Sequence, residues 1–382
     1  MKINYKLENR SYSIIFCPDK EGLKIKKKIK SYTTIAKDLK LKYKKQKILL
    51  AVDKRIDHTV TKYLINDLKI SFPKMSVMYL SGEKVNKNFK ELKKLINFFF
   101  DKKFTKKSVL ISCGGGVIGD LCGLASSLYL RGLIYYSIPS TMTAIVDSCI
   151  GGKTGINYRG VINSLGTYYH PEKVYISKNI FNLIPKKEYL AGIPEIIKCG
   201  LISKNSIINL LESRNKVIGR NFSFLSTIIK KALETKIKFF KDDVFENHKR
   251  LNLNFGHTFA HAIEMSLKSK NNKDQIRHGE AVGIGILCEI FYSNGKNKNF
   301  SRVKELLSLY GLPHNINHLV DKKTQNKIKK DIYQNIFLDK KTIKKNPRYI
   351  KFISIGKTNI SEMKDYKLIK KTIDKVIFDT NE

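Results

Sequence analysis

Residues 109–157 read VLISCGGGVIGDLCGLASSLYLRGLIYYSIPSTMTAIVDSCIGGKTGIN, and they carry the most informative motifs of the chain. Its first residues, Val109 to Ser112, form a short apolar run that is typical of a buried strand, and glycines 114–116 follow at once. A helical pattern then runs from about Gly119 to Leu130. A strand, a glycine turn and a helix together present backbone N–H groups and a helix N-terminus to a phosphate. The spacing is not G-x-G-x-x-G, so the standard dinucleotide fingerprint is absent.

The second half of the stretch adds a series of short motifs after a predicted strand at Leu133 to Ile138. They are PST at 139–141, VDS at 146–148 and GGKTGIN at 151–157. A lone GGKT could be a surface turn, because it lacks the full Walker spacing. The whole series in this order resembles the cofactor-binding half of the 3-dehydroquinate synthase family, which belongs to the sugar phosphate cyclases.

Length and composition set the broad class. The 382 residues allow one large or two ordinary domains, and 42% hydrophobic content is normal for a globular protein. No apolar run approaches the roughly 18 residues that a membrane span needs. The N-terminus carries charge at Glu8 and Arg10, which argues against a signal peptide and predicts a strand pair around residues 8–10.

Charge and cysteine usage suggest partners and compartment. A formal net charge of +40 points at first to nucleic acid. The lysines are spread over most of the chain and no recognised binding motif accompanies them, so we expect attraction for anionic substrates rather than a nucleic-acid site. The six cysteines are scattered without a C-x-x-C motif, which predicts reduced thiols and a cytoplasmic protein. We expect no membrane partner.

Strands alternate with helices through the first half of the chain. The predicted strands are 48–52, 75–80 and 109–112, and the predicted helices are 56–68 and 89–100. This alternation predicts an α/β fold, with a Rossmann-like, mainly parallel sheet covered by helices on both faces. Ligands of such sheets lie at the carboxyl ends of the strands. Asp53, Gly82, Glu83 and the segment 114–120 all fall at those ends, which makes a dinucleotide site credible.

After Pro185 the sequence pattern changes from alternating strands and helices to mainly helices. We therefore predict an NAD-binding α/β domain at 1–184 and a mostly α-helical domain for metal and substrate at 185–382. The expected helices are 187–199, 207–211, 222–240, 254–267 and 278–291, with a polar loop at 271–275 and short strands at 349–355 and 375–378.

Histidines and a glutamate in the second half have the residue types of a catalytic metal site. His257 and His261 are four residues apart, so on a helix they share one face. Glu195 and His278 add further ligand types, and a catalytic zinc site uses about three protein ligands with one position open. Two isolated histidines are more often simply buried or exposed, and sequence cannot show that these residues meet. The segments PEIIKCG, RLNLNFGHTFAHAIE and HGEAVGIGI resemble the metal-bearing segments of the family.

The resemblance assigns roles to individual residues. It implies that Glu195, His257 and His278 bind a divalent metal, zinc or cobalt, and that His261 is a nearby proton-transfer group. Lys153, Lys198 and Glu246 are the other implied catalytic residues, and Lys198 is also an implied substrate contact. The implied substrate contacts are Arg131 (from a partner subunit, hence a homodimer), Asp147, Asn163, Lys236, Arg250, Asn254 and one of Lys340 and Lys341. The implied NAD contacts are Asp53, Glu83, Lys84, Gly115, Gly116, Val117, Ile118, Gly119, Asp120, Ser140, Thr141, Lys153, Phe181, Asn182 and Leu183.

The family converts 3-deoxy-D-arabino-heptulosonate 7-phosphate, a sugar acid phosphate, into 3-dehydroquinate and phosphate in the shikimate pathway of aromatic amino acid biosynthesis. The resemblance implies that NAD accepts and returns a hydride within one turnover, so that phosphate leaves by β-elimination from an acidified C–H. Lysines and arginines would neutralise phosphate and carboxylate.

Three positions depart from the family pattern. Asn86 and Ile162 stand where lysines are usual, and Ala260 replaces a glycine between the helix histidines. The first two remove positive charge near the expected cofactor and phosphate. At Ile162 two outcomes are open: a nearby lysine such as Lys84 or Lys87 reaches into the gap, or the site tolerates weaker binding of the cofactor. Two alternatives stay open: a sugar phosphate cyclase that makes another carbocycle, and a basic nucleic-acid-binding protein on an inactive scaffold. The motif at 147–153 favours the dehydroquinate branch over relatives that cyclise sedoheptulose phosphate.

Overall fold

The computed structural model describes the chain apart from residues 8–9, 18–29, 160, 204–205, 268–274, 339–345 and 381–382, and the side chains of 30–33. The chain divides into two compact units, Met1–Tyr189 and Leu190–Glu382. The boundary between the units lies a short way after Pro185, where the sequence pattern becomes mainly helical. Lys340, Lys341 and most of the loop expected at 271–275 lie outside the described residues.

The first unit is built on a seven-stranded sheet in the order β1-β2-β9-β6-β5-β3-β4. Strands β1 and β2 form the antiparallel pair expected at the N-terminus, and every other neighbouring pair is parallel. The predicted mainly parallel sheet is therefore confirmed. Its strands are β1 (Lys2–Leu7), β2 (Arg10–Cys17), β3 (Ile48–Asp53), β4 (Ser76–Leu80), β5 (Val109–Gly114), β6 (Ile134–Pro139) and β9 (Lys173–Ser177).

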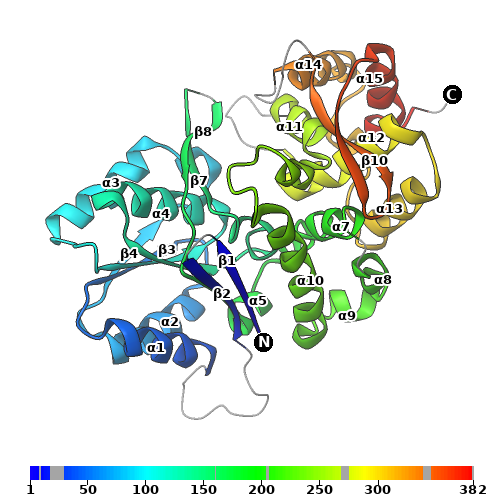
Figure 1. Ribbon diagram of the computed structural model, residues 1–382. Helices are drawn as coiled ribbons and strands as arrows, with labels where there is room; N and C mark the ends of the chain where they lie inside the picture. Colours follow the sequence, from blue (N-terminus) through cyan, green and yellow to red (C-terminus); the bar gives the residue numbers. More distant parts are fainter. Residues whose placement is uncertain are drawn as a thin grey trace. The chain divides into compact units, whose positions relative to one another are not determined.

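Helices cover both faces of this sheet (Figure 1). Helices α1 (Lys30–Tyr43) and α2 (His58–Ser71) share one apolar core with the sheet, whereas α3 (Phe89–Asp101) and α4 (Gly116–Leu128) share a second core on the opposite face. Since β3 and β5 are buried on both sides, their sequences are continuous apolar runs. Short turns complete the unit: η1 (Lys84–Asn86), η2 (Tyr129–Arg131), η3 (Ala144–Ser148), α5 (Lys178–Asn182) and α6 (Lys186–Leu190).

A separate hairpin follows the glycines of the GGKTGIN motif. Strands β7 (Lys153–Tyr158) and β8 (Val161–Tyr168) pair antiparallel and project away from the main sheet (Figure 1). Gly152 has φ +69°, a conformation that favours glycine, and turns the chain into β7. Gly123 of α4 has no Cβ, which lets Thr154 of β7 lie directly against the helix. The sequence did not predict this hairpin.

The second unit is mostly helical. At its centre α12 is apolar on all sides, and it packs against α7, α11, α13 and β10. The helices are α7 (Ile193–Leu201), α8 (Ile207–Leu211), α9 (Arg214–Ile218), α10 (Phe222–Phe240), α11 (His257–Ser266), α12 (His278–Asn294), α13 (Lys298–Leu309), α14 (Gln325–Phe337) and α15 (Tyr366–Thr372), with turns η4 (Lys249–Asn254), η5 (Asn317–Leu319) and η6 (Ile373–Ile377).

Two elements predicted after Pro185 were wrong. The single helix expected at 187–199 is two helices, α6 and α7, because the chain turns at Gly192 and restarts with Pro194 in the first turn of α7. The strand expected at 375–378 is a helical turn, η6, whose apolar residues pack against α12.

A two-stranded sheet, β10 (Arg348–Ser354) with β11 (Lys357–Glu362), lies against α12. Side chains of α12 bind the backbone of β10: Glu289 accepts from the N–H of Ile350 at 3.1 Å and Ser293 from that of Phe352 at 3.0 Å. Asn294 donates to the carbonyl of Phe352 at 2.8 Å. The helix therefore satisfies backbone groups of β10 that an edge strand leaves without a ladder partner.

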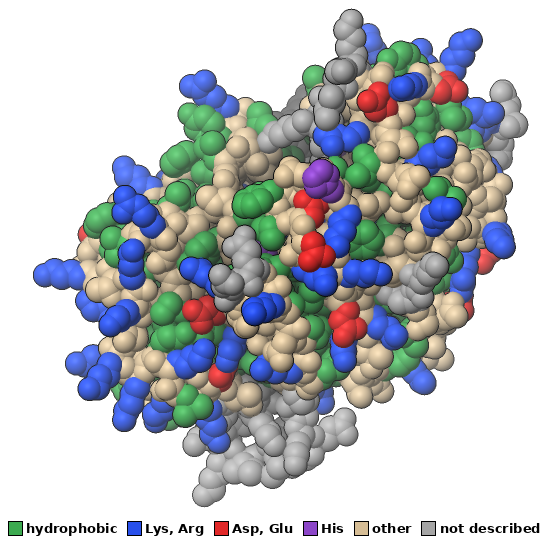
Figure 2. Space-filling model, in the orientation of Figure 1, with side chains coloured by type: hydrophobic (Ala, Val, Ile, Leu, Met, Phe, Trp, Pro, Cys, Tyr) green, Lys and Arg blue, Asp and Glu red, His purple; other side chains and the backbone are tan. Residues whose placement is uncertain are grey.

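Lysine and arginine side chains are scattered across the face of the molecule seen in Figure 2, among tan and green atoms, rather than gathered into one band. All six cysteines are buried and unpaired with one another. Within the described residues, no helix is both long and apolar enough to cross a membrane.

Candidate active site

The carboxyl ends of the parallel strands collect the residues predicted to bind the cofactor. Because β9, β6, β5, β3 and β4 run in the same direction, the segments that follow them meet at one edge of the sheet. Asp53 ends β3, Ser140 and Thr141 follow β6, and Glu83 lies just beyond β4. Asn182 and Leu183 are exposed after β9, whereas the Phe181 ring is buried against Tyr189.

The glycine turn after β5 brings the start of α4 to this edge. Gly115 is the N-cap of α4 and has no side chain to occupy the N–H groups of the first turn. A Cβ on Gly115 would lie 3.1 Å from Thr141, and one on Gly116 would lie 3.2 Å from Ser148. The glycines therefore allow close approach between the ends of β5 and β6. Val117 and Gly119 are partly exposed beside them, and the Ile118 side chain lies in the core, so only its backbone can face a ligand.

Lys87 occupies the position for which the sequence predicted a missing charge. Its ammonium group contacts both Asp120 of α4 and Asn163 of β8, and the side chain is buried. Burial raises the pKa of the Asp120 carboxyl, and the neighbouring Lys87 opposes that rise. Asn86 instead donates to Ser81 at 2.8 Å. The lysine expected at position 86 thus stands one residue later along the chain, in contact with predicted cofactor and substrate residues.

Asp53 and Arg55 form a bidentate pair at the end of β3. Arg55 Nε lies 3.1 Å from Oδ1 of Asp53, Nη2 lies 2.8 Å from Oδ2, and Nη2 also donates to the carbonyl of Gly82 at 2.7 Å. A Cβ on Gly82 would collide with Asp53 at 2.0 Å. Glycine is therefore required for the ends of β3 and β4 to approach. Glu83 and Lys84 are exposed beside this pair.

Other predicted residues of the first unit surround Asp120. Asp147 in η3 and Lys153 at the start of β7 both act electrostatically on the Asp120 carboxyl, in opposite directions. Gly115, Gly119, Asp120 and Lys153 also line one small pocket. Ile162 is 43% exposed on β8. Arg131 is exposed in a turn where two successive non-glycine residues, Leu130 and Arg131, have φ of +50° and +61°.

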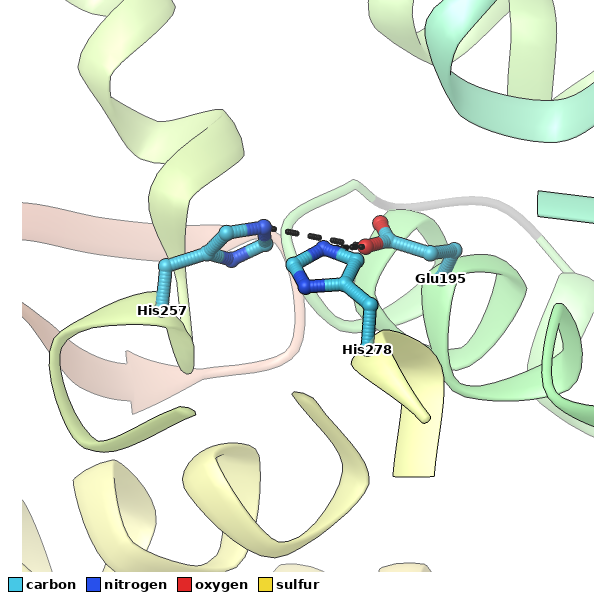
Figure 3. A group of neighbouring side chains, drawn as sticks. All are labelled: Glu195, His257 and His278. Atoms are coloured by element: carbon cyan, nitrogen blue, oxygen red, sulfur yellow. Dashed lines mark ion pairs between the residues drawn. The ribbon is translucent and has the colours of Figure 1, made fainter. Parts of the chain in front are cut away.

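The predicted metal ligands of the second unit meet in space (Figure 3). Glu195 comes from α7, while His257 and His278 are the first residues of α11 and α12. Their ligand atoms all lie within 4.8 Å of one another. Nε2 of His257 is 3.7 Å and Nε2 of His278 is 3.6 Å from Oε1 of Glu195. In a zinc site each ligand atom lies roughly 2.0–2.2 Å from the ion, so two ligand atoms of one ion are slightly closer together than these pairs. A small inward shift of the side chains would therefore bring all three into contact with one ion.

The chemistry of this cluster fits a divalent cation. Glu195 is 1% exposed, and its Oε1, although buried, makes no hydrogen bond to any described residue. The imidazole nitrogens are too far from Oε1 for hydrogen bonds but suitably placed for a shared ion. Lys198, one turn along α7, forms an ion pair with Oε2. Burial alone would raise the pKa of Glu195, but Lys198 and His278 lower it, so the carboxyl is ionised.

Each histidine of the cluster has a second partner that orients its ring. Nδ1 of His278 lies 3.0 Å from Oε2 of Glu264, and Nδ1 of His257 lies 3.2 Å from the carbonyl of Phe255. A proton on Nδ1 leaves the Nε2 lone pair directed at the cluster. Burial alone would lower the pKa of His278, but Glu264 and Glu195 raise it to about 10. A cation at the cluster would replace this proton.

His261 and Lys198 lie beside the ligands. The His261 ring is 5.5 Å from that of His257 and 6.3 Å from that of His278, measured between centroids. His261 is partly exposed, so solvent or substrate can reach it. Lys198 is fully buried and supplies a fixed positive charge next to Glu195.

The predicted substrate residues of this unit lie on η4, α10 and the loop between them, and α10 also packs against α7. Asn254 donates to Glu246 at 2.7 Å, and Glu246 has φ +61°. Arg250 is buried, lies over the Phe240 ring and donates to the carbonyl of Val244 at 2.5 Å. Lys236 is buried on α10. Lysine and arginine here provide the charges that an anionic substrate requires.

Sequence profiles of known families match both halves of the chain. The profile for the 3-dehydroquinate synthase N-terminal region matches residues 77–191, and that for the C-terminal region matches residues 192–342. The chain belongs to the 3-dehydroquinate synthase family. It is 36% identical to the 3-dehydroquinate synthase of Dictyoglomus thermophilum over 80% of this chain and 84% of that one. It is 30% identical to that of Thermoanaerobacter pseudethanolicus over 96% and 98% of the two chains.

Solved structures share the fold of this 3-dehydroquinate synthase family member. A 2-deoxy-scyllo-inosose synthase in complex with carbaglucose-6-phosphate, NAD+ and Co2+ has a TM-score of 0.82 at 20% identity, covering 99% of this chain and 100% of that one. The 2-epi-5-epi-valiolone synthase of Streptomyces hygroscopicus, with NAD+ and Zn2+ bound, has a TM-score of 0.75 at 19% identity and covers 97% of both chains.

Sequence reasoning missed residues that act behind the predicted ligands. Glu264 was within the quoted segment RLNLNFGHTFAHAIE, seven residues after His257 and therefore on the same helical face, which was a usable signal. Arg55 follows Asp53 by two residues but belongs to no recognisable motif, so the sequence offered no signal for its role. Glu289 lies far along the chain from its partners on α11 and β10, and nothing in the sequence marked it.

Proposed function

We propose that this protein is a 3-dehydroquinate synthase, which cyclises 3-deoxy-D-arabino-heptulosonate 7-phosphate to 3-dehydroquinate and releases phosphate. Membership of the family over both halves of the chain carries the proposal. The ligand cluster of Glu195, His257 and His278 supports it independently, because it provides a mixed carboxylate and imidazole site. The enzyme is a phosphorus–oxygen lyase of the shikimate pathway.

Glu195, His257 and His278 would hold a divalent metal, zinc or cobalt. Zn2+ and Co2+ occur in the solved structures of fold relatives. Such a metal polarises the oxygens of substrate hydroxyls and lowers the cost of forming an alkoxide. The protein's part is to align the three ligands, which Glu264 and the Phe255 carbonyl support by fixing the orientation of the imidazole rings.

The carboxyl edge of the sheet would bind NAD, which accepts a hydride from a secondary alcohol and later returns it. Backbone N–H groups at the start of α4 suit its phosphates. Asp53, Glu83, Asp120, Ser140 and Thr141 offer oxygens for its hydroxyls. Lys84, Lys153 and the segment 181–183 are the remaining proposed contacts.

We assign the other charged residues to substrate and proton transfer. His261 is the proton-transfer group beside the metal ligands, and Lys198 and Glu246 assist it. The proposed substrate contacts are Lys236, Arg250, Asn254, Asp147, Lys153 and Asn163. Arginine and lysine neutralise the anionic groups of such a substrate.

A homodimer in the cytoplasm is the proposed assembly. Arg131 supports a contribution to a partner's active site, because it is exposed and held by a turn whose backbone is strained at two successive residues. Leu128 and Leu130 beside it are 52% and 42% exposed, as residues at an interface between subunits would be in an isolated chain.

The decisive experiment is an assay of phosphate release from the heptulosonate phosphate, with and without a chelator. We expect phosphate and 3-dehydroquinate in equal amounts, no accumulation of NADH absorbance, loss of activity with chelator and recovery on adding Zn2+ or Co2+. Stoichiometric NADH would instead indicate a simple dehydrogenase.

The second candidate is a sugar phosphate cyclase that makes a different carbocycle, since the solved structures above are named as an inosose synthase and a valiolone synthase. Glucose 6-phosphate and sedoheptulose 7-phosphate, assayed in parallel, separate the candidates. Turnover of either at a higher kcat/KM than the heptulosonate phosphate would reject the proposed substrate.

A further inference from the structure

Helix α11 begins at His257 without a cap from its own segment. Its N-cap residue, Gly256, has no side chain and has φ +83°. The first N–H groups of any helix lack partners within it, and Ser, Thr, Asp or Asn at the N-cap usually supplies one. Here the N–H of Thr258 donates to Oε1 of Glu289 at 3.3 Å. A residue of another helix thus caps the helix that starts with a metal ligand.

Glu289 is fully buried on α12 and links three elements. Its Oε1 accepts from Thr258 of α11, and its Oε2 accepts from the N–H of Ile350 in β10 at 3.1 Å. A buried carboxyl group is strongly unfavourable unless it is hydrogen-bonded, and a carboxylate is favoured near a helix N-terminus. Both conditions are met at this position.

Close backbone packing makes the position of this cap consequential. A Cβ on Gly285 of α12 would lie 2.0 Å from the carbonyl of Gly256, so the start of α11 rests directly on the α12 backbone. Thr258 also donates from its hydroxyl to the carbonyl of Arg348 at 2.8 Å. The first turn of α11 is therefore anchored at its base by glycine contacts and at Thr258 by Glu289 and β10.

We propose that Glu289 is a positioning residue for the metal ligand His257. It holds the N–H of the next residue, Thr258, and so fixes the first turn of α11 and the direction in which the His257 ring points. This inference rests on the proposed metal site. Glu289 accepts from backbone N–H groups, those of Thr258 and Ile350, so its effect passes through the backbone of α11.

Glu289→Gln tests the inference with almost no change in side-chain size. The amide keeps one acceptor oxygen, but its nitrogen is a donor, so either Thr258 or Ile350 must face a donor. We expect the Zn2+ affinity, measured by competition with a chromophoric chelator, to fall about ten- to a hundredfold. Amide hydrogen exchange at Thr258 should become faster. Glu289→Asp keeps the charge but is one methylene too short, so it should also lower the Zn2+ affinity and speed amide exchange at Thr258.

Ser293→Ala is the matched control. Ser293 lies one turn further along α12, where its hydroxyl donates to the carbonyl of Glu289 at 2.7 Å and accepts from the N–H of Phe352 in β10 at 3.0 Å, so its removal leaves the Glu289 carboxyl group in place. Its loss should lower the thermal stability and leave the Zn2+ affinity within about twofold of wild type, below the range for a ligand-supporting partner.

The outcomes separate the inference from the proposed function. Wild-type protein that binds Zn2+ while Glu289→Gln binds it equally well would overturn the positioning role. Equal losses of affinity in Glu289→Gln and Ser293→Ala would overturn it too, because the effect would then be general destabilisation. Wild-type protein that does not bind Zn2+ at all would reject the metal site itself.

Discussion

The two units build their sites in different ways. In the α/β unit, predicted cofactor residues follow strand ends and rely on backbone N–H groups and glycines, so strand order alone brings them together. In the helical unit, three side chains from three helices converge, and each depends on a buried partner. We therefore expect the cofactor site to tolerate single substitutions better than the metal site, because many backbone groups share in its geometry.

Removing a metal ligand should have the largest effect. His278→Ala deletes one of three ligand side chains, and we expect metal affinity to fall by more than about a hundredfold, since loss of a mere supporting partner costs about ten- to a hundredfold. Metal content by mass spectrometry and phosphate release check this. His314→Ala, a partly buried histidine elsewhere in the same unit, is the control and should keep both. Full metal content in His278→Ala would refute the ligand assignment.

Removing the buried charge of Lys87 in the α/β unit should have a smaller effect on binding than removing a metal ligand. Lys87→Met removes the cation that contacts Asp120 and Asn163, and we expect NAD to bind about tenfold more weakly, as for one lost charged hydrogen bond. Isothermal titration with NAD measures this. Lys94→Met, which removes a half-exposed lysine paired with Glu91 on the same helix, should leave NAD affinity unchanged. If the two variants bind NAD alike, Lys87 has no part in the cofactor site.

An ion pair between α1 and β9 should affect the stability of the fold but not the metal site. Lys173 and Tyr175 bind Asp38, and although burial alone would raise the pKa of Asp38, their hydrogen bonds lower it. A lowered carboxyl pKa adds stability above the usual value near 4 and loses it as pH falls through the lowered pKa. Asp38→Asn should therefore cost about 1–2 kcal/mol of unfolding free energy at pH 7 and less at pH 3.

Denaturant titrations at the two pH values check the Asp38 prediction, with Asp101→Asn, at the exposed end of α3, as the control. Metal affinity should stay at the wild-type level in both variants. A loss of stability in Asp38→Asn that is the same at pH 3 and pH 7 would contradict the electrostatic explanation.

The smallest effect is expected at Ile162. This side chain is 43% exposed on β8, next to Asn163, which Lys87 already contacts. Ile162→Lys should tighten NAD binding only a few-fold and make it less sensitive to ionic strength, because a local charge replaces screened, distant ones. Ile162→Met controls for length and flexibility. Unchanged affinity of the lysine variant across a salt series would show that position 162 does not face the cofactor.

Periodicity predicted most regular elements of the chain. Strand β5, helix α8 and helix α10 begin at the predicted residues, because apolar runs and helical spacing report burial directly. The hairpin β7–β8 was missed because its strands are short, largely exposed and rich in glycine and asparagine. The run at 375–378 was mistaken for a strand because short apolar runs do not distinguish a strand from a buried helical turn.

The sequence allowed prediction only of those site residues that stand in recognisable motifs. Glu195, His257 and His278 stood in recognisable segments, but their convergence depends on how α7, α11 and α12 pack. The sequence predicted a gap at Asn86, whereas the structure supplies the charge from Lys87. Glu289 was invisible, because hydrogen bonds from one helix to the backbone of another leave no periodic trace.

The burial of every cysteine has a consequence for resistance to oxidants. Thiol oxidation and disulfide exchange require a thiolate that can be reached from solvent. Burial raises the pKa of Cys113 to about 12 and that of Cys288 well above its ordinary value, so both remain protonated at neutral pH. No thiol lies exposed to react with peroxide or glutathione disulfide in the folded chain. The native enzyme should therefore keep its activity under oxidative stress, and alkylating reagents should label it only as fast as it unfolds.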